Sequence, residues 1–185
     1  MNDNITASVR ELFQARGNSR YGGEAVSQLE HALQAAFFAE RGGGDSNLIA
    51  AALLHDVGHL LHELPADAPD RGIDDRHEAL GAEWLEARFP AAVVQPVKLH
   101  VEAKRYLVAT DDDYLRQLSA PSIQSLQLQG GPMSATEIAE FEQNPHLAAA
   151  LALRRCDDAA KVPQLVTASL DFYLRHVTVA CGESS

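Results

Sequence analysis

An apolar run interrupted by imidazole and carboxylate groups is the feature that most constrains the fold of this chain. Residues 50–62 read AAALLHDVGHLLH and place His55, Asp56 and His59 among alanines and leucines. Such a run predicts a buried helix. Because an unsatisfied buried polar group costs roughly 2–7 kcal/mol, these side chains need hydrogen-bond partners or a bound ion.

Helical patterns continue through the rest of the sequence and predict an all-α fold, a compact helical bundle. In the stretch EAVSQLEHALQAAFFAERGGG, apolar residues recur at spacings of three and four before a glycine run ends the pattern. No strand pattern of alternating residues occurs. The expected helices span about 24–41, from an N-cap at Asp45 or Ser46 to Pro65, 76–89, 91–109, a segment ending near 159, and 163–178.

Local signals refine these helices. Pro96 indicates a kink or a late start of its helix. The sequence SATE at 134–137 is a capping box, and Asn144 followed by Pro145 is typical of an N-cap and a first helical residue. The stretch SIQSLQLQGGP at 122–132 predicts a short helix that ends in a turn.

Composition limits the classes of protein to which the chain can belong. At 185 residues with 46% hydrophobic residues, one domain over 1–185 is expected. The net charge of -11 argues against nucleic acid or an anionic membrane as partner. The two cysteines, Cys156 and Cys181, make no disulfide framework, and neither a signal peptide nor a membrane-spanning run is evident. A cytoplasmic location is therefore expected.

Further histidine and aspartate residues occur in other predicted helices. They are His31, His77, His100 and Asp157. A lone histidine in an apolar helix is more often a hydrogen-bonded core residue than a ligand, but their number favours a metal site. Imidazole and carboxylate without thiolate form a ligand set for iron, manganese or zinc.

The positions within residues 50–62 suggest different roles. His55 and His59 are four residues apart and are expected on one face of a single helix, with Asp56 rotated by about 100° from His55. His62, three residues beyond His59, could extend the same face or mark the solvent end of the helix, and the second interpretation is preferred.

The spacing of these residues resembles a known family. His31, the His55–Asp56 pair and Asp157 match the H…HD…D pattern of the HD-domain superfamily of helical metalloenzymes. Four segments, YGGEAVSQLEH, AALLHDVGH, HVEAKRYLV and LQGGPM, are similar to the HD-domain phosphonate oxygenases over about residues 21–157. The resemblance implies a mixed-valent Fe(II)/Fe(III) diiron centre that uses O2 to split the carbon–phosphorus bond of a 1-hydroxyphosphonate into a carboxylate and phosphate.

The resemblance also implies a ligand set for the two irons. His31, His55, Asp56 and Asp157 would hold one iron, and Asp56, His77 and His100 the other. Asp56 would bridge them, since it is adjacent to His55 but points elsewhere.

The same resemblance assigns groups that bind and process the substrate. Phosphonate donors would be His59, Lys104, Ser122, Gln129, Gly130 and Arg154. Tyr21 and Glu24 match a pair that the family uses as a lid, with Glu24 meeting the substrate's amino group. Tyr21, Glu24, His59 and Lys104 are the expected catalytic residues.

Six of these assignments have a simpler structural alternative. His59 could be a hydrogen-bonded core histidine. Lys104 could lie on a solvated helix face, Arg154 could favour a helix C-terminus, and Ser122 could be an N-cap. Tyr21 could be a buried aromatic residue, and Glu24 could favour a helix N-terminus.

The loop at 64–76 departs from the family, because it is rich in proline and aspartate rather than in glycine and aromatic residues. The substrate's amine, primary or trimethylated, stays open, and with it the product, glycine or glycine betaine. A separate hydroxylase is expected to make the 1-hydroxyphosphonate.

Two other functions remain possible at this point. An HD-domain phosphohydrolase would use a metal-activated water on a nucleotide or phosphate ester and would need no oxygen. A non-catalytic HD sensor would bind a small anion, and the presence of all six expected ligands argues against it.

Overall fold

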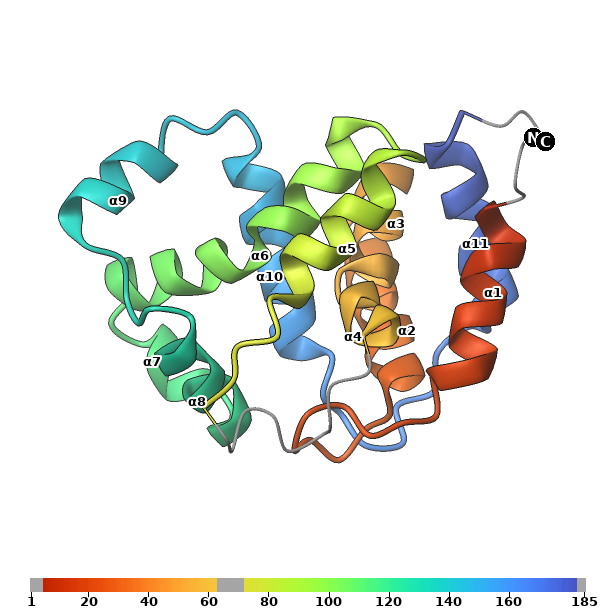
Figure 1. Ribbon diagram of the computed structural model, residues 1–185, viewed down its shortest axis with the longest axis horizontal. Helices are drawn as coiled ribbons and strands as arrows, with labels where there is room; N and C mark the ends of the chain where they lie inside the picture. Colours follow the sequence, from red (N-terminus) through yellow and green to blue (C-terminus); the bar gives the residue numbers. More distant parts are fainter. Residues whose placement is uncertain (1–4, 63–71, 183–185) are drawn as a thin grey trace.

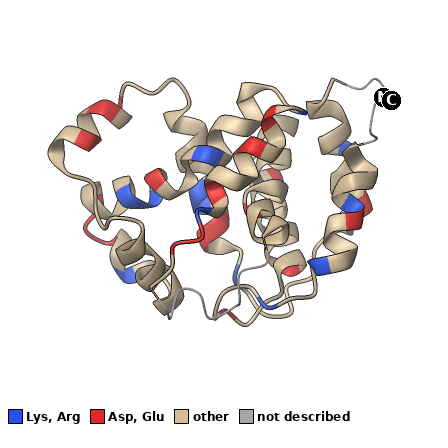
Figure 2. Cartoon of the chain, in the orientation of Figure 1, with Lys and Arg blue, Asp and Glu red and all other residues tan. Residues whose placement is uncertain are grey.

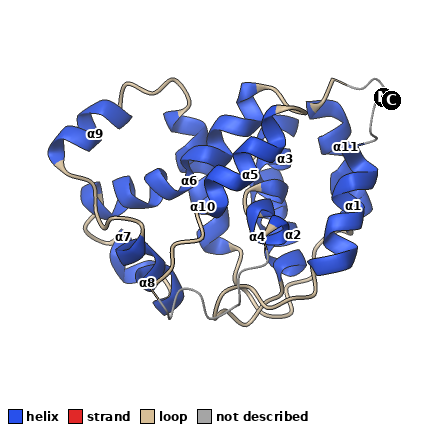
Figure 3. Cartoon of the chain, viewed as in Figure 1, coloured by secondary structure: helices blue, strands red, loops and turns tan. Residues whose placement is uncertain are grey.

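The computed structural model describes residues 5–62 and 72–182, and within these residues every regular element is a helix (Figures 1 and 3). The all-α prediction is therefore confirmed. An isolated β-bridge pairs Arg20 with Ser27. The helices are α1 (Ile5–Arg16), α2 (Gln28–Arg41), α3 (Ser46–Leu54), α4 (Val57–Leu61), α5 (His77–Glu86), α6 (Ala91–Thr110), α7 (Tyr114–Gln117), α8 (Ala120–Leu128), α9 (Ala135–Phe141), α10 (Leu147–Ala159) and α11 (Leu170–Ala180).

Helix α3 is central to the packing. It contacts α2, α6, α10 and α11, and its residues 49–54 are all buried. A helix that is apolar on every side is stable only when neighbours surround it. Helix α10 packs against α6 and α2, and α5 packs against α6 and α4. Figure 1 shows α7, α8 and α9 at one end of the molecule and α1 with α11 at the other.

The expected single helix from Asp45 to Pro65 is instead two helices. Helix α3 ends at Leu54, and α4 begins at Val57 after Asp56 leaves the helical conformation at φ -103° and ψ 16°. Tertiary packing overrides the helical pattern here, because α4 packs against α5 at Gly58. A Cβ atom at Gly58 would lie 2.0 Å from the carbonyl oxygen of His77.

Three helix starts differ from the sequence predictions. Helix α2 begins at Gln28 rather than near 24, because Ser27 and Glu30 form a capping box. Helix α10 begins at Leu147, and Asn144 instead closes a turn through its Oδ1, which accepts the N–H of His146 at 2.9 Å. Helix α11 begins at Leu170 rather than at 163, because Ser169 caps it.

Other local signals are confirmed. Ser134 and Glu137 form the predicted capping box of α9. The short helix α8 ends before Gly130 and Gly131, which both have positive φ. Pro96 lies inside α6, which begins at Ala91, so a late start of that helix was the wrong interpretation.

The N-terminal helix α1, which is not among the expected helices, packs against α11, α2 and α4. Within residues 5–62 and 72–182 no helix combines the length and apolarity needed to cross a membrane. Charged residues are spread over the helices in Figure 2, and the connection into α5 carries acidic residues.

Candidate metal centre and adjoining pocket

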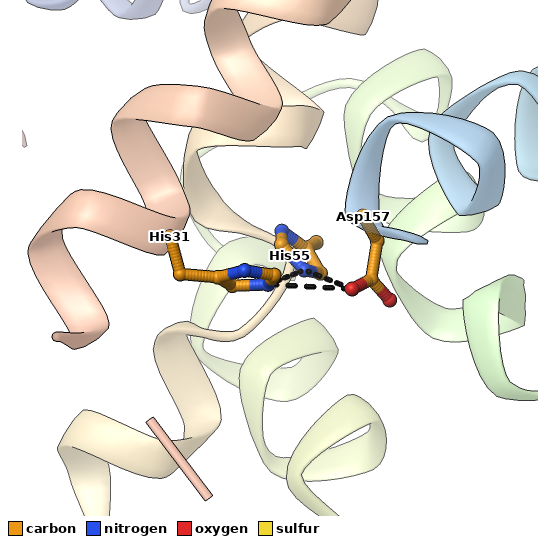
Figure 4. Close-up of side chains that lie close together, drawn as sticks. All are labelled: His31, His55 and Asp157. Carbon is orange, nitrogen blue, oxygen red and sulfur yellow. Dashed lines mark hydrogen bonds and ion pairs between the residues drawn. The ribbon is translucent and has the colours of Figure 1, made fainter. Parts of the chain in front are cut away.

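Three buried side chains from separate helices meet in the first half of the candidate centre (Figure 4). His31 comes from α2, His55 is the C-cap residue that follows α3, and Asp157 lies near the end of α10. The Nε2 atoms of the two histidines are 3.1 Å apart. Oδ1 of Asp157 lies 3.3 Å from Nε2 of His31 and 3.8 Å from Nε2 of His55.

A second histidine pair lies beside the first. His77 is the first residue of α5 and His100 lies within α6, and both are buried. Their Nε2 atoms are again 3.1 Å apart. The ring centroids of His55 and His100 are 5.4 Å apart, so the two pairs adjoin.

Asp56 lies between the two pairs. Its Oδ2 is 3.4 Å from Nε2 of His31 and 3.3 Å from Nε2 of His55. Its Oδ1 is 3.4 Å from Nε2 of His77 and 3.5 Å from Nε2 of His100. The break between α3 and α4 places this carboxylate so that each oxygen faces one pair.

The second nitrogen of each imidazole is already occupied by an acceptor, which fixes the tautomers. A carbonyl or carboxylate oxygen can only accept, so each Nδ1 carries the proton and each Nε2 presents a lone pair when the ring is neutral. The Nδ1 contacts are His31 to the carbonyl of Ala160 at 2.7 Å, His55 to that of Ala52 at 2.8 Å, His100 to that of Val97 at 2.6 Å, and His77 to Oδ1 of Asp75 at 2.8 Å.

These groups fit two bound cations. Facing lone pairs 3.1 Å apart repel unless a cation lies between them. Both oxygens of Asp56 and Oδ1 of Asp157 are buried without a hydrogen-bond donor, a situation that a metal ion resolves. Histidines whose Nδ1–H donates to a carbonyl or carboxylate are typical metal ligands.

Protons compete with a metal for the same positions. Burial favours the neutral carboxyl, yet the charge on His55 holds the pKa of Asp56 well below its ordinary value. Burial lowers and the Asp56 charge raises the pKa of His55, with a net rise to about 10. Burial also lowers the pKa of His100 to about 3. The centre therefore attracts positive charge, and metal binding should release protons.

A cavity of about 440 Å³ adjoins the second pair and Asp157. His31, His55 and Asp56 are not among the residues that border it. The predicted site residues that border it are Tyr21, Glu24, His59, His77, His100, Lys104, Ser122, Gln129, Arg154 and Asp157.

Two buried basic side chains border this cavity. Lys104 is 3% exposed and donates to Oγ of Ser125 at 2.8 Å, which excludes the alternative of a solvated helix face. Burial, followed by repulsion from Arg154, lowers the pKa of Lys104 to about 7. Arg154 is 4% exposed and contacts Oδ2 of Asp157 at 2.7 Å, while its other nitrogens contact Asp158.

Ser122 and Gln129 reach the cavity from α8 and its C-cap. Ser119, not Ser122, is the N-cap of α8, and Oγ of Ser122 accepts from Nζ of Lys161 at 2.7 Å. Oε1 of Gln129 is buried without a donor. Gly130 does not border the cavity. A Cβ there would lie 3.5 Å from the Arg105 guanidinium.

Tyr21 and Glu24 belong to a turn that precedes α2. The Tyr21 ring stacks on the His31 ring with centroids 3.7 Å apart and planes 12° from parallel. Burial, followed by the charges of Asp157 and Asp56, raises the pKa of Tyr21 well above its ordinary value. Glu24 accepts from Oγ of Ser119, and Nζ of Lys161 lies 3.9 Å away. Glu24 therefore precedes the helix and does not favour its N-terminus.

His59 lies on α4 and borders the cavity. It does not share a helix face with His55, because His55 follows α3. Its Nδ1 lies 2.7 Å from Oδ2 of Asp75, and its ring stacks on His77 at 4.1 Å. His62 also borders the cavity and reaches the same oxygen at 3.1 Å. The interpretation of His62 as a solvent-facing helix end therefore missed its place in the pocket wall.

Sequence reasoning missed several supporting residues. Asp75, Ser119, Ser125, Asp158 and Lys161 contact predicted site residues. Asp158 also accepts from the hydroxyl of Tyr114. Two of these residues could have been found from the sequence, because Asp75 is two residues from His77 and Asp158 is adjacent to Asp157. Within the unusual loop at 64–76, residues 64–71 lie outside the described residues.

The sequence matches the HD domain family over residues 29–119. It is 46% identical over 164 residues to a 1-hydroxy-2-(trimethylamino)ethyl phosphonate dioxygenase (glycine-betaine-forming) from Leisingera caerulea, and the alignment covers 89% of this chain and 84% of that protein. It is also 46% identical over 179 residues to a hydroxymethylphosphonate dioxygenase from Gimesia maris, covering 96% and 88% of the two chains.

These similarities extend along nearly the whole chain. The chain therefore belongs to the phosphonate dioxygenases of the HD domain family.

Proposed function

We propose that the chain is a diiron dioxygenase that cleaves the carbon–phosphorus bond of a 1-hydroxyphosphonate. The observation that carries the proposal is the position of the candidate metal centre at the wall of a cavity that two buried basic side chains, Lys104 and Arg154, also border. Two relatives at 46% identity have names that specify dioxygenases of phosphonates with a hydroxyl on the carbon bonded to phosphorus.

The proposed reaction balances without an external reductant. One O2 and R–CH(OH)–PO3²⁻ give R–COO⁻, HPO4²⁻ and one proton, so each product gains one oxygen atom. The carbon–phosphorus bond and the hydrogen on that carbon are both lost. Two iron ions, as an Fe(II)/Fe(III) pair, would supply the activation of O2 when bound.

The ligands for the two ions follow the two histidine pairs. His31, His55 and Asp157 would hold one ion, His77 and His100 the other, and Asp56 both. Imidazole and carboxylate ligands without thiolate suit iron in this role. The chain's own contribution is to fix each Nε2 toward the centre through the hydrogen bonds at Nδ1.

The phosphonate would bind on the cavity side of the second pair. Lys104 and Arg154 would meet its negative charge in a buried setting, where charge-assisted hydrogen bonds are strong. Ser122 and Gln129 would complete the contacts, and the buried Oε1 of Gln129 would accept a hydrogen bond from the substrate's hydroxyl group. His59 would donate from Nε2 when both ring nitrogens are protonated, because Asp75 already occupies Nδ1.

Tyr21 would act as a lid. Its ring covers His31, and a substrate that reaches the first pair must displace it. Glu24 lies three residues away in the same turn, with its N–H bonded to the carbonyl of Tyr21 at 2.8 Å. A cation that draws Glu24 from Ser119 would therefore also move Tyr21.

We propose a primary ammonium as the preferred substituent on the second carbon. Glu24 can accept hydrogen bonds from it, whereas a trimethylammonium group cannot donate them and favours aromatic faces. Tyr21 is the one Phe, Tyr or Trp residue that borders the cavity among the described residues, and residues 1–4, 63–71 and 183–185 contain none of these three types.

The reaction would follow a separate hydroxylase, since the substrate needs a hydroxyl on the carbon bonded to phosphorus. We also propose a cytoplasmic location, in keeping with a sequence that holds only two cysteines.

The test is phosphate release by iron-loaded protein with and without O2. The substrates are 2-amino-1-hydroxyethylphosphonate, its trimethylammonio analogue and hydroxymethylphosphonate. Release that requires both iron and O2 is expected, fastest with the primary amine. Equal release without O2 would indicate a phosphohydrolase instead, and faster release from the trimethylammonio compound would refute the preference for a primary amine.

A further inference from the structure

Asp75 joins three histidines on the side of the second pair away from Asp56. Its Oδ1 lies 2.8 Å from Nδ1 of His77, and its Oδ2 lies 2.7 Å from Nδ1 of His59 and 3.1 Å from Nε2 of His62. These are hydrogen-bond lengths. Asp75 lies two residues before His77, the first residue of α5, and Figure 2 shows acidic residues in red along the connection into this helix.

The chemistry of this contact determines what the opposite ring nitrogens present. An ionised carboxylate only accepts hydrogen bonds, so Nδ1 of both His77 and His59 must carry a proton. Nε2 of a neutral His77 is then free to bind a metal ion. Nε2 of His59 is the nitrogen that remains for a ligand in the cavity.

The two rings are held as one unit. His59 and His77 stack with centroids 4.1 Å apart and planes 20° from parallel, and each donates to a different oxygen of the same carboxylate. A rotation of Asp75 would therefore disturb both rings together, although they come from α4 and α5.

The local backbone is adapted to this contact. Arg76 adopts φ 50° and ψ 37°, a left-handed conformation that non-glycine residues rarely adopt. It turns the chain so that Oδ1 of Asp75 also accepts the backbone N–H of His77 at 3.3 Å. The carboxylate thus contacts both the backbone and the ring of the residue two positions later.

We propose that Asp75 is a positioning residue that fixes the metal-facing nitrogen of His77 and the substrate-facing nitrogen of His59 through one carboxylate. It thereby couples the second metal position to the phosphonate site. The half that concerns His59 rests on the proposed function, whereas the half that concerns His77 requires only that the centre binds metal.

The variants Asp75→Asn and Asp75→Ala test the proposal. Asparagine keeps the size but offers one acceptor oxygen, so it can satisfy only one of the two Nδ1–H groups. Asp74→Asn and Asp74→Ala are the matched controls. They make the same change one residue away, where the exposed carboxylate accepts the N–H of Arg76 at 3.3 Å.

The first measurement is Fe(II) binding to metal-free protein under anaerobic conditions, with iron content per chain and melting temperature measured in parallel. We expect one of the two ions to bind roughly 10- to 100-fold more weakly in both Asp75 variants. The other ion should bind as in the parent protein, and the Asp74 variants should bind both. The electron paramagnetic resonance signal of the coupled iron pair should decline in the Asp75 variants alone.

The second measurement is the dependence of phosphate release on 2-amino-1-hydroxyethylphosphonate concentration at saturating iron. KM should rise in Asp75→Ala by a factor similar to that in His59→Ala. The double variant should show little further rise, because both changes remove the same arrangement.

The outcomes are separable. Unchanged affinity for both ions in Asp75→Ala would overturn the proposal, as would equal weakening of both ions together with a lower melting temperature, which indicates a structural role only. Additive effects of Asp75→Ala and His59→Ala on KM would overturn the coupling. If the parent protein releases no phosphate from any hydroxyphosphonate, the proposed function fails, while iron binding still decides the role of Asp75 toward His77.

Discussion

The two carboxylate oxygens of Asp56 face different histidines. Oδ2 lies 3.3 Å from Nε2 of His55, and Oδ1 lies 3.4 Å from Nε2 of His77. One short side chain therefore faces two histidine pairs that come from different helices. This relationship depends on the break between α3 and α4, since Asp56 occupies neither helix.

Loss of Asp56 should remove both metal ions. In Asp56→Ala, each histidine pair loses the carboxylate oxygen that balances the charge of its ion, so iron content should fall from about two per chain to well below one. His100→Ala is the comparison, because it removes a ligand of one pair and should leave about one iron per chain. Elemental analysis after anaerobic loading measures both. An Asp56→Ala protein with a full complement of iron would exclude the bridging role.

Gly58→Ala should disturb the contact between α4 and α5. The new Cβ would lie 2.0 Å from the carbonyl oxygen of His77, so the helices must separate at a cost of about 1–3 kcal/mol in the free energy of unfolding. Urea denaturation checks this value. Gly42→Ala is the control, since its Cβ would lie 3.3 Å from the nearest atom and φ is -75°. An equal loss of stability in both variants would show that the contact between Gly58 and the carbonyl oxygen of His77 is not the cause.

Substrate binding should be linked to proton uptake by Lys104. Its pKa of about 7 in the fold, lowered by burial and then by Arg154, leaves the amine largely neutral at pH 8. A bound phosphonate dianion favours the charged amine and raises this pKa, so binding at pH 8 should take up close to one proton, and binding at pH 6 much less.

Calorimetry in buffers of different ionisation enthalpy measures that proton uptake. The measurement uses 2-amino-1-hydroxyethylphosphonate without O2. The proton uptake attributable to Lys104 is the difference between the uptake by the parent protein and that by Lys104→Gln. Lys98→Gln, which changes an exposed residue on the same helix, should take up as many protons as the parent protein. Equal uptake in the parent and in Lys104→Gln would rule out this role.

Tyr21→Phe should keep the aromatic ring stacked on His31 but remove the tyrosine hydroxyl group. We expect the fold and iron content to persist and O2 consumption without substrate to rise several-fold, because the hydroxyl no longer blocks the site. An oxygen electrode measures this rate. Tyr106→Phe, which removes a hydroxyl bonded to Glu142 at 3.1 Å on an exposed surface, provides the matched control. A Tyr21→Phe protein with the parent's rate would argue against the lid.

The sequence predicted the helical class, the capping of α9 and the family, because these depend on local patterns or on motif spacing. All six candidate ligands were also proposed from the sequence, and in the structure they lie in two adjoining groups. His59 and Lys104 reach the cavity as expected.

The break at Asp56 escaped prediction for a physical reason. Residues 46–61 read as continuous helix, and only the approach of Gly58 to His77 explains the interruption. Asp75 was missed in the same way, because its role depends on the left-handed turn at Arg76 and on histidines from two helices. Such relationships exist only after the chain has folded.

Oxygen isotope labelling tests the central claim most directly. The iron-loaded protein is incubated with 2-amino-1-hydroxyethylphosphonate under ¹⁸O2 in ordinary water, and phosphate and glycine are analysed by mass spectrometry. A dioxygenase places one ¹⁸O atom in phosphate and one in the carboxylate of glycine, with one O2 consumed per phosphate released. Phosphate that carries no ¹⁸O under ¹⁸O2, but does carry ¹⁸O in a second incubation under ordinary O2 in H2¹⁸O, would contradict oxidative cleavage of the carbon–phosphorus bond.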